Sequence, residues 1–301
     1  MKGWDYNLNL EFDKYQGIKN WLRYKICDLD YDCDVSKYAM EVYREKYEFL
    51  SNGIVQPQYN NFSSLQKWNR HNLKWEIQVN DTLYSGDTLN SFATPFNRFA
   101  NEFISKISNK KFKLTYIGES AYDLLLKEFD IVFSDYNLSQ VEYSREILDY
   151  FDKFATLTHT IGNLFPVPLY FNRERAGKNG EYEFPDILLN SIYEYYLNED
   201  DNKRSFGISV INDKTKIKKT VNWLDSFGDG KEGWDEFIRV YRFSMYLDEN
   251  SEPIKLWSSH NIKNLKIPDI GKDFLNYLSY ICDCIEKRGK EIFDMGSMLE
   301  F

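Results

Sequence analysis

Apolar side chains recur every three or four positions along much of this chain, a spacing that is typical of amphipathic α-helices. Phe96, Phe99 and Phe103 share one helical face in this way, and we interpret that face as part of the core. The pattern predicts helices over residues 14–28, 36–50, 94–107, 123–129, 144–154, 186–196, 234–247 and 272–293.

Residues with known preferences for helix ends mark several of these boundaries. Ser36 is expected to cap the N-terminus of the second helix. Thr94 followed by Pro95 predicts a cap and then a proline at the first helical position. Asn52-Gly53 is expected to stop the helix that begins after Ser36, with the glycine in the left-handed conformation.

Strict alternation of apolar and polar residues, which predicts a half-buried strand, is clearest over residues 73–79. A second short strand is predicted over 110–117. The polar stretches between elements are predicted as loops or turns: residues 56–66, 80–87, 156–180, 198–203 and 226–233. Because helices outnumber strands, the expected fold class is mainly helical α+β, with a small antiparallel sheet.

Length and composition place the chain among globular proteins. Its 301 residues, 43% of them hydrophobic and 17% aromatic, suffice for one sizeable domain over 1–301, with a subdivision near 155–180 where the chain becomes polar and rich in Gly and Pro. The first residues lack the apolar run of a signal peptide, and no stretch reaches the roughly 18 apolar residues of a membrane span. We therefore expect a cytoplasmic protein without membrane contact, and the Lys, Asn, Ile and Tyr usage suggests a bacterial or phage source.

The net charge of -9 argues against extended contact with nucleic acid, because an acidic chain repels phosphates at long range. Four cysteines are too few for a disulfide scaffold at this length, and Cys282 and Cys284 are too closely spaced for a zinc site. We interpret the cysteines as reduced and mostly buried thiols.

One acidic stretch partly fits a calcium loop. Asp30, Asp32, Asp34 and Glu41 fall at ligand positions of such a loop, but Val35 stands where glycine is needed for the turn. The preferred interpretation is a solvated acidic turn whose last carboxylate favours the positive end of the following helix. No metal site is predicted elsewhere, and the sequence implies no particular cofactor.

The strongest candidate for chemistry is a polar cluster in the second half of the chain. It gathers His159, Asn163, Asn172, Arg175 and Lys178 within about 20 residues, with turn-forming residues between them. Arginine and lysine near glycine suit an oxyanion or phosphate, and a histidine can move a proton near neutral pH.

The catalytic residues predicted on this basis are His159 as the general base and Asp186 as the group that orients it, with Glu174 as an alternative. The ligand-binding residues are predicted to be Asp87, Asn163, Asn172, Arg175 and Lys178. A structural interpretation is the alternative: the histidine and the asparagines then only hold loop backbone, and the arginines pair with neighbouring glutamates on the surface.

Two resemblances bear on this cluster. Ile161-Gly162-Asn163-Leu164, with Asn172 nine residues on, resembles the Gly-Asn-Leu half of a His-Asn-His nuclease subfamily. The metal-binding histidine of that subfamily has no counterpart in residues 149–154, so the resemblance does not imply nuclease activity.

A wider resemblance covers most of the chain. It is carried by Asn52-Gly53, Ser85 to Leu89, Asn172 to Arg175, Asp186 to Ile192, Asp273 to Tyr277 and Ile285 to Ile292. In this order the chain resembles an uncharacterised bacterial domain-of-unknown-function family whose last helix carries an arginine. The resemblance implies Asp87, Asn172, Arg175 and Asp186 as shared positions and implies no reaction. Ala176 and Asn190 depart from the glycine and glutamate typical of that family.

Two functions follow as hypotheses. The first is a pocket for a phosphate-bearing small molecule, nucleotide or nucleic-acid end, with hydrolysis as the reaction. The second is a non-catalytic factor that binds another protein, as in defence of a bacterium against phage or in counter-defence. The oligomeric state, the ligand and the reaction do not follow from the sequence.

Overall fold

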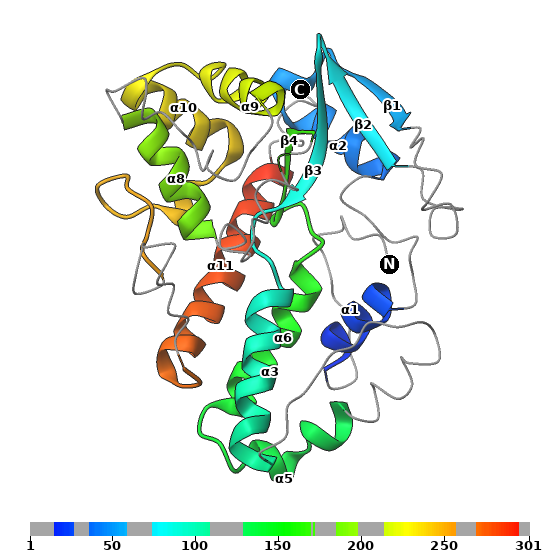
Figure 1. The fold of residues 1–301 in the computed structure, drawn as a ribbon, viewed down its shortest axis with the longest axis vertical. Coiled ribbons are helices and arrows are strands. Elements are labelled where there is room, and N and C mark those ends of the chain that lie inside the picture. The colour runs from blue at the N-terminus through cyan, green and yellow to red at the C-terminus, as the bar shows by residue number, and fades with distance from the viewer. Residues whose placement is uncertain are drawn as a thin grey trace.

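The computed structural model describes residues 15–26, 36–58, 74–108, 129–169, 171, 185–197, 214–256 and 269–294. In this part of the chain, helices predominate around a small antiparallel sheet, as the sequence predicted (Figure 1). The first helices are α1 (Gln16–Ile26), α2 (Lys37–Lys46), α3 (Ala93–Ser108), α5 (Asp135–Leu138) and α6 (Ser144–Leu157). The later ones are α8 (Pro185–Leu197), α9 (Lys214–Asp225), α10 (Gly230–Tyr241) and α11 (Lys272–Asp294).

The sheet has the simple order β1-β2-β3-β4, with every neighbouring pair antiparallel. Its strands are β1 (Ile54–Gln58), β2 (Lys74–Val79), β3 (Thr82–Thr88) and β4 (Leu164–Pro168). The first three follow one another along the chain, whereas β4 joins from far downstream and pairs with β3. That pairing brings the end of α6 to the sheet.

Of the four strands, only β2 was predicted as a strand, and the other three fall wholly or partly in stretches that were predicted as loops or turns. The stretch 80–87 forms a turn only at its start, where Asn80 adopts a positive φ of 50°, and then continues as β3. The stretch 56–66 begins within β1, and the polar stretch 156–180 contains β4, which is buried along its whole length. Ser, Gly, Asp and Pro make these segments look like turns, but pairing with distant strands extends them.

One face of β2 was predicted to be solvent-exposed, but Glu76 on that face is buried. Gly53 does not adopt a positive φ, which corrects the prediction of a left-handed glycine after α2. A β-carbon at Gly53 would collide with Ile77 of β2, so close packing against the sheet explains the glycine.

Several helix boundaries also differ from the prediction. Ser36 caps α2 as expected, with its Oγ accepting from the Ala39 amide at 3.1 Å. However, α2 ends at Lys46, and a short 3-10 turn covers Glu48–Leu50. Helix α3 begins at Ala93, so Thr94 lies inside it and does not cap it.

Helix α10 was predicted to start at Trp234 after a charged loop. Instead it starts at Gly230 and ends at Tyr241, before a 3-10 turn at Ser244–Tyr246. Asp229 precedes it, and its side chain accepts from the Gly230 amide at 2.9 Å. Helices α5 and α9 were not predicted. The predicted strand 110–117, most of the helix 123–129, the loop 198–203 and the acidic positions Asp30, Asp32 and Asp34 lie outside the described residues.

The core is built largely from aromatic side chains. Between α3 and α6, Phe96 and Phe99 contact Phe151, in both cases with ring centroids 5.3 Å apart. A second aromatic cluster lies between α9, α10 and β4, where Trp223 and Tyr241 are buried and Tyr241 packs edge-on against Phe165. The long helix α11 packs along α6 and connects the two regions (Figure 1).

Cys282 and Cys284 lie on α11 as buried free thiols. Burial raises the thiol pKa of both residues, which keeps the protons on the sulfur atoms at neutral pH. Cys27 and Cys33 lie outside the described residues. Among the helices of the described ranges, none is both long and apolar enough to cross a membrane.

Candidate functional site

Three of the predicted site residues lie in two segments that meet at one junction, where the end of β3 faces the turn that precedes β4. Asp87 pairs in register with Phe165, and the Leu89 amide donates to the Asn163 carbonyl oxygen at 2.7 Å. His159 lies in the same turn, four residues before Asn163, and its side chain is half-buried. The structure therefore brings together the two segments that carry Asp87 and, in one turn, His159 and Asn163, although Asp87 and His159 are 72 positions apart in the sequence.

Asn163 and Asn90 form buried hydrogen bonds with each other across this junction, and we call this pair of residues the clasp. The Oδ1 atom of Asn163 accepts from the Asn90 amide at 3.0 Å and from Asn90 Nδ2 at 2.8 Å. Its Nδ2 atom donates to the carbonyl oxygens of Asn90 and Thr158, each at 3.0 Å. These four bonds use both N–H groups and both lone pairs of the amide. The geometry thus favours the structural interpretation of Asn163 over the prediction that it binds a ligand.

Arg288 of α11 holds the same turn from the other side. Its side chain is fully buried, and Nη1 lies 3.1, 2.8 and 3.0 Å from the carbonyl oxygens of Ile161, Gly162 and Leu164. The guanidinium group suits these three carbonyl oxygens, because it is planar and rigid and carries several N–H donors. The turn that carries His159 is consequently pinned to the long C-terminal helix.

The rest of the guanidinium reaches two other elements. Nε donates to the Tyr241 carbonyl oxygen at the end of α10 at 2.9 Å, and Nη2 donates to the Tyr47 hydroxyl after α2 at 2.8 Å. The ring of Phe243 lies 4.8 Å from the guanidinium carbon, which adds a cation–π contact. Burial raises the pKa of the Tyr47 hydroxyl, and the positive charge of Arg288 opposes that shift only in part. Tyr47 therefore stays neutral and accepts the hydrogen bond.

No ion pair between Arg288 and a carboxylate is found among the described residues. Carbonyl oxygens, one hydroxyl and one aromatic face take the place of a counter-ion. The sequence carried a signal for this residue, since Arg288 falls on the apolar face defined by Ile281, Ile285 and Ile292. A charged residue at a core position of an amphipathic helix indicates a buried polar interaction.

The two predicted aspartates are both buried, in different elements. Asp87 is fully buried on β3, and its Oδ1 atom accepts from the Thr88 amide at 2.8 Å. Asp186 lies in the first turn of α8 and is 3% exposed. It is the acidic residue of the first turn of this helix.

Asn172, Glu174, Arg175 and Lys178 lie outside the described residues. Phe171, directly before them, is buried and packs edge-on against Trp223 with ring centroids 5.3 Å apart. Strand β4 separates this position from the turn that holds His159, because the turn precedes the strand and Phe171 follows it. The described part of the predicted cluster thus lies before β4, and Phe171 lies after it.

Within the described ranges, no three His, Cys, Asp or Glu side chains gather in an arrangement that would hold a metal ion. No family model, no curated protein and no solved structure matches this chain. The resemblance to a domain-of-unknown-function family stays a prediction.

Proposed function

We propose that the protein binds a phosphate-bearing ligand, a nucleotide or a nucleic-acid end, beside the turn 158–163, and hydrolyses its phosphate ester. The observation that carries this proposal is the rigidity of that turn. Asn163 ties it to the end of β3, and Arg288 ties it to α11, so His159 is a partly exposed histidine on fixed backbone. Catalytic groups act best when buried contacts hold their backbone in place.

The remaining roles are assigned from residue chemistry. Arg175 and Lys178 would neutralise the phosphate, Asn172 would hydrogen-bond it, and Asp186 would orient His159. In hydrolysis a water oxygen attacks phosphorus, His159 accepts the proton of that water, and the ester oxygen leaves with the bonding electrons. Asn163 has no part in this scheme beyond holding the turn.

The test is thermal unfolding of the protein against a panel of nucleotides, phosphate esters and inorganic phosphate. A ligand that binds only the folded state stabilises it by about 2.7 kcal/mol at a concentration of 100 times its Kd. We expect a rise in Tm with at least one phosphate compound. Arg175→Ala should abolish the rise while the Tm of the free protein is unchanged.

His159→Gln separates binding from chemistry, since it should retain the thermal shift and lose phosphate release. Arg239→Ala removes an exposed arginine on α10 and is the matched control for the loss of a positive charge. If no phosphate compound raises the Tm of the wild-type protein, the ligand proposal is wrong.

The second candidate function is binding of another protein without catalysis. Several large apolar side chains are exposed on the described surface: Tyr38, Ile54, Ile131, Tyr136, Leu197 and Phe293. Exposed aromatic and aliphatic groups of this kind serve as anchors in protein interfaces. Failure of the whole ligand panel, together with a specific protein complex, would favour this function.

A further inference from the structure

Helix α1 packs against α6 at close range (Figure 1). A β-carbon at Gly17, in the first turn of α1, would collide with the Asp152 carbonyl oxygen and with Thr156 Oγ1 on α6. Glycine at this position therefore lets the backbone of α1 lie directly on α6. The contact leaves no room for a larger residue at position 17.

Asp152 also joins the two helices through its side chain. Its Oδ1 atom accepts from the Ile18 amide at 2.9 Å, and the side chain is half-buried at the contact. The first amides of an α-helix have no partner within the helix, so this carboxyl group from α6 satisfies one of them in place of an N-cap residue. The buried Trp21 ring of α1 packs on Phe92, just before α3, with centroids 4.6 Å apart. One side chain of α6 therefore helps to position a helix that covers part of the aromatic core.

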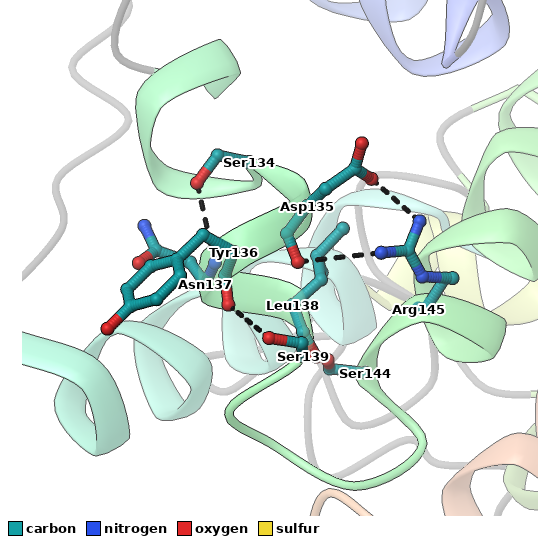
Figure 2. A network of polar contacts seen from close by, with 8 residues as sticks. All are labelled: Ser134, Asp135, Tyr136, Asn137, Leu138, Ser139, Ser144 and Arg145. Atoms are coloured by element: carbon teal, nitrogen blue, oxygen red, sulfur yellow. Dashed lines mark hydrogen bonds and ion pairs between the residues drawn. The ribbon is translucent and has the colours of Figure 1, made fainter.

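Helix α6 is anchored to other elements as well. Arg145, in its first turn, donates to the Asp135 carboxylate of α5 at 2.7 Å (Figure 2). The charge of Arg145 also acts on Asp149, which follows one turn later in α6. Ser144 Oγ donates to the Leu138 carbonyl oxygen at 2.7 Å, and α11 packs along α6. If the contact between α1 and α6 opens, α1 is therefore the element that moves.

Two carboxyl groups of α6 act on the start of α1. Asp149, three residues before Asp152, forms a hydrogen bond with the Tyr15 hydroxyl group. Like charges three or four positions apart on a helix destabilise each other. Lys19 of α1 opposes the charge of Asp152, but its ammonium group also pairs with Asp130 at 2.8 Å. Ionisation of both carboxyl groups therefore places two negative charges against α1.

The balance of these forces raises the pKa of Asp152. Burial is the largest cause and the charge of Asp149 adds to it, so the pKa rises to about 6. The amides of Ile18 and Gly17 and the charge of Lys19 favour the ionised form but do not cancel the effect of burial. When α1 leaves α6, water reaches the carboxyl group and its pKa returns to the ordinary value of about 4. Protonation of Asp152 and docking of α1 therefore favour each other.

We propose that α1 is a latch that docks on α6 while the Asp152 carboxyl group carries a proton and detaches more readily once that group is ionised. Ionisation leaves a poorly hydrated negative charge at the contact, and release of α1 lets water reach it. Release also uncovers Phe92 and Phe96, since the Trp21 ring packs on both. Local opening of this kind has a lower free energy than global unfolding. The latch does not depend on ligand binding at the turn 158–163.

The experiment measures amide hydrogen exchange of the whole chain at pH 5 and pH 7.5, with rates corrected for the intrinsic effect of pH. Protection of α1 should fall roughly tenfold between these pH values, as expected for a carboxyl group whose pKa is about 6 when docked and about 4 when released. At pH 7.5 the amides of α1 should be less protected than those of α10, which identifies the opening as local.

Three variants serve as tests and controls. Asp152→Asn keeps the acceptor without the charge, so protection of α1 should be the same at both pH values. Asp235→Asn removes an exposed carboxylate of α10 and should behave as wild type. Gly17→Ala should remove the protection of α1 at both pH values and leave α10 protected, because its β-carbon collides with the backbone of α6.

Three results would each overturn the latch. In the first, α1 of the wild-type protein is equally protected at pH 5 and pH 7.5, or Asp152→Asn keeps the pH dependence of wild type. In the second, α1 and α10 are equally protected at pH 7.5, so that α1 opens only when the whole fold does. In the third, Gly17→Ala retains the protection of α1.

Discussion

Gly162 lies against α11 so closely that a β-carbon at this position would collide with the carbonyl oxygen of Ile285. The same glycine offers its own carbonyl oxygen to Arg288, at 2.8 Å from Nη1. The turn before β4 therefore touches α11 directly through its backbone, and one residue serves both the contact and the hydrogen bond. A larger residue at 162 would push the turn away from the helix that holds it.

Gly162→Ala should accordingly destabilise the protein by about 1–3 kcal/mol or more, the usual cost of overpacking a core. The collision is with backbone of α11, which cannot rotate away as a side chain can. Equilibrium unfolding in denaturant measures the effect. Gly271→Ala is the control, because a β-carbon there meets only ordinary contact distances. Equal stability of the two variants would show that the turn does not pack as described.

Arg288→Met should cost about 3 kcal/mol or more, because it leaves several buried carbonyl oxygens without their donor. Methionine fills similar space, so the loss reports hydrogen bonds more than packing. Arg288→Lys restores the charge but not the planar fork, and should recover only part of the stability. Arg239→Met, in an exposed ion pair with Glu236, should change the unfolding free energy by less than about 0.5 kcal/mol.

The clasp between Asn90 and Asn163 should appear as a coupling in a double-mutant cycle. Asn90 Nδ2 donates to Asn163 Oδ1 in a buried site, and this bond joins the two side chains, whereas the other bonds between these residues use the backbone of Asn90. Asn90→Ala and Asn163→Ala should therefore show an interaction energy of about 0.5–1.5 kcal/mol, the net contribution of one hydrogen bond. Additive single effects, measured by chemical unfolding, would contradict the clasp.

Asp152 connects two helices and makes stability depend on pH. Its carboxylate lies on α6 and accepts from the Ile18 amide at the start of α1, at 2.9 Å. Burial raises the pKa of this carboxyl group to about 6, and the nearby charge of Asp149 adds to the rise. The amides of Ile18 and Gly17 and the charge of Lys19 act in the opposite direction but do not cancel it.

Because the pKa in the folded state lies above the ordinary carboxyl value, the folded state binds the proton more tightly than the unfolded chain. The stabilisation that Asp152 contributes is therefore fully present below pH of about 4 and is lost as pH rises through about 6. Asp152→Asn keeps the acceptor and removes the charge, so its stability relative to wild type should increase between pH 4 and pH 7.

Unfolding free energies across that pH range, together with an NMR titration of the Asp152 carboxyl carbon, measure both parts of this prediction. The exposed Asp283→Asn on α11 corrects for the removal of one surface carboxylate. A titration midpoint for Asp152 near 4 would contradict the burial that raises its pKa. So would a stability difference between wild type and Asp152→Asn that does not change with pH.

The sequence by itself determined the helical part of this protein. Burial along an amphipathic helix repeats within a few residues, so the faces of α3, α6 and α11 could be read from local spacing. The same holds for the cap at Ser36 and for the alternation in β2, which each depend on residues next to one another in the chain.

Tertiary structure alone decided which polar residues meet. Strand β4 pairs with β3 from about 80 positions away, and its Pro-rich sequence carries no local alternation to predict that pairing. Asn163 was predicted to bind a ligand because its amide suits one, but Asn90 and the carbonyl oxygen of Thr158 together use the whole amide inside the fold. A buried hydrogen bond depends on which groups the packed chain brings within reach, and those groups are distant in sequence. For the same reason, Arg288 could be recognised as unusual from its helix face, whereas its partners could not be named.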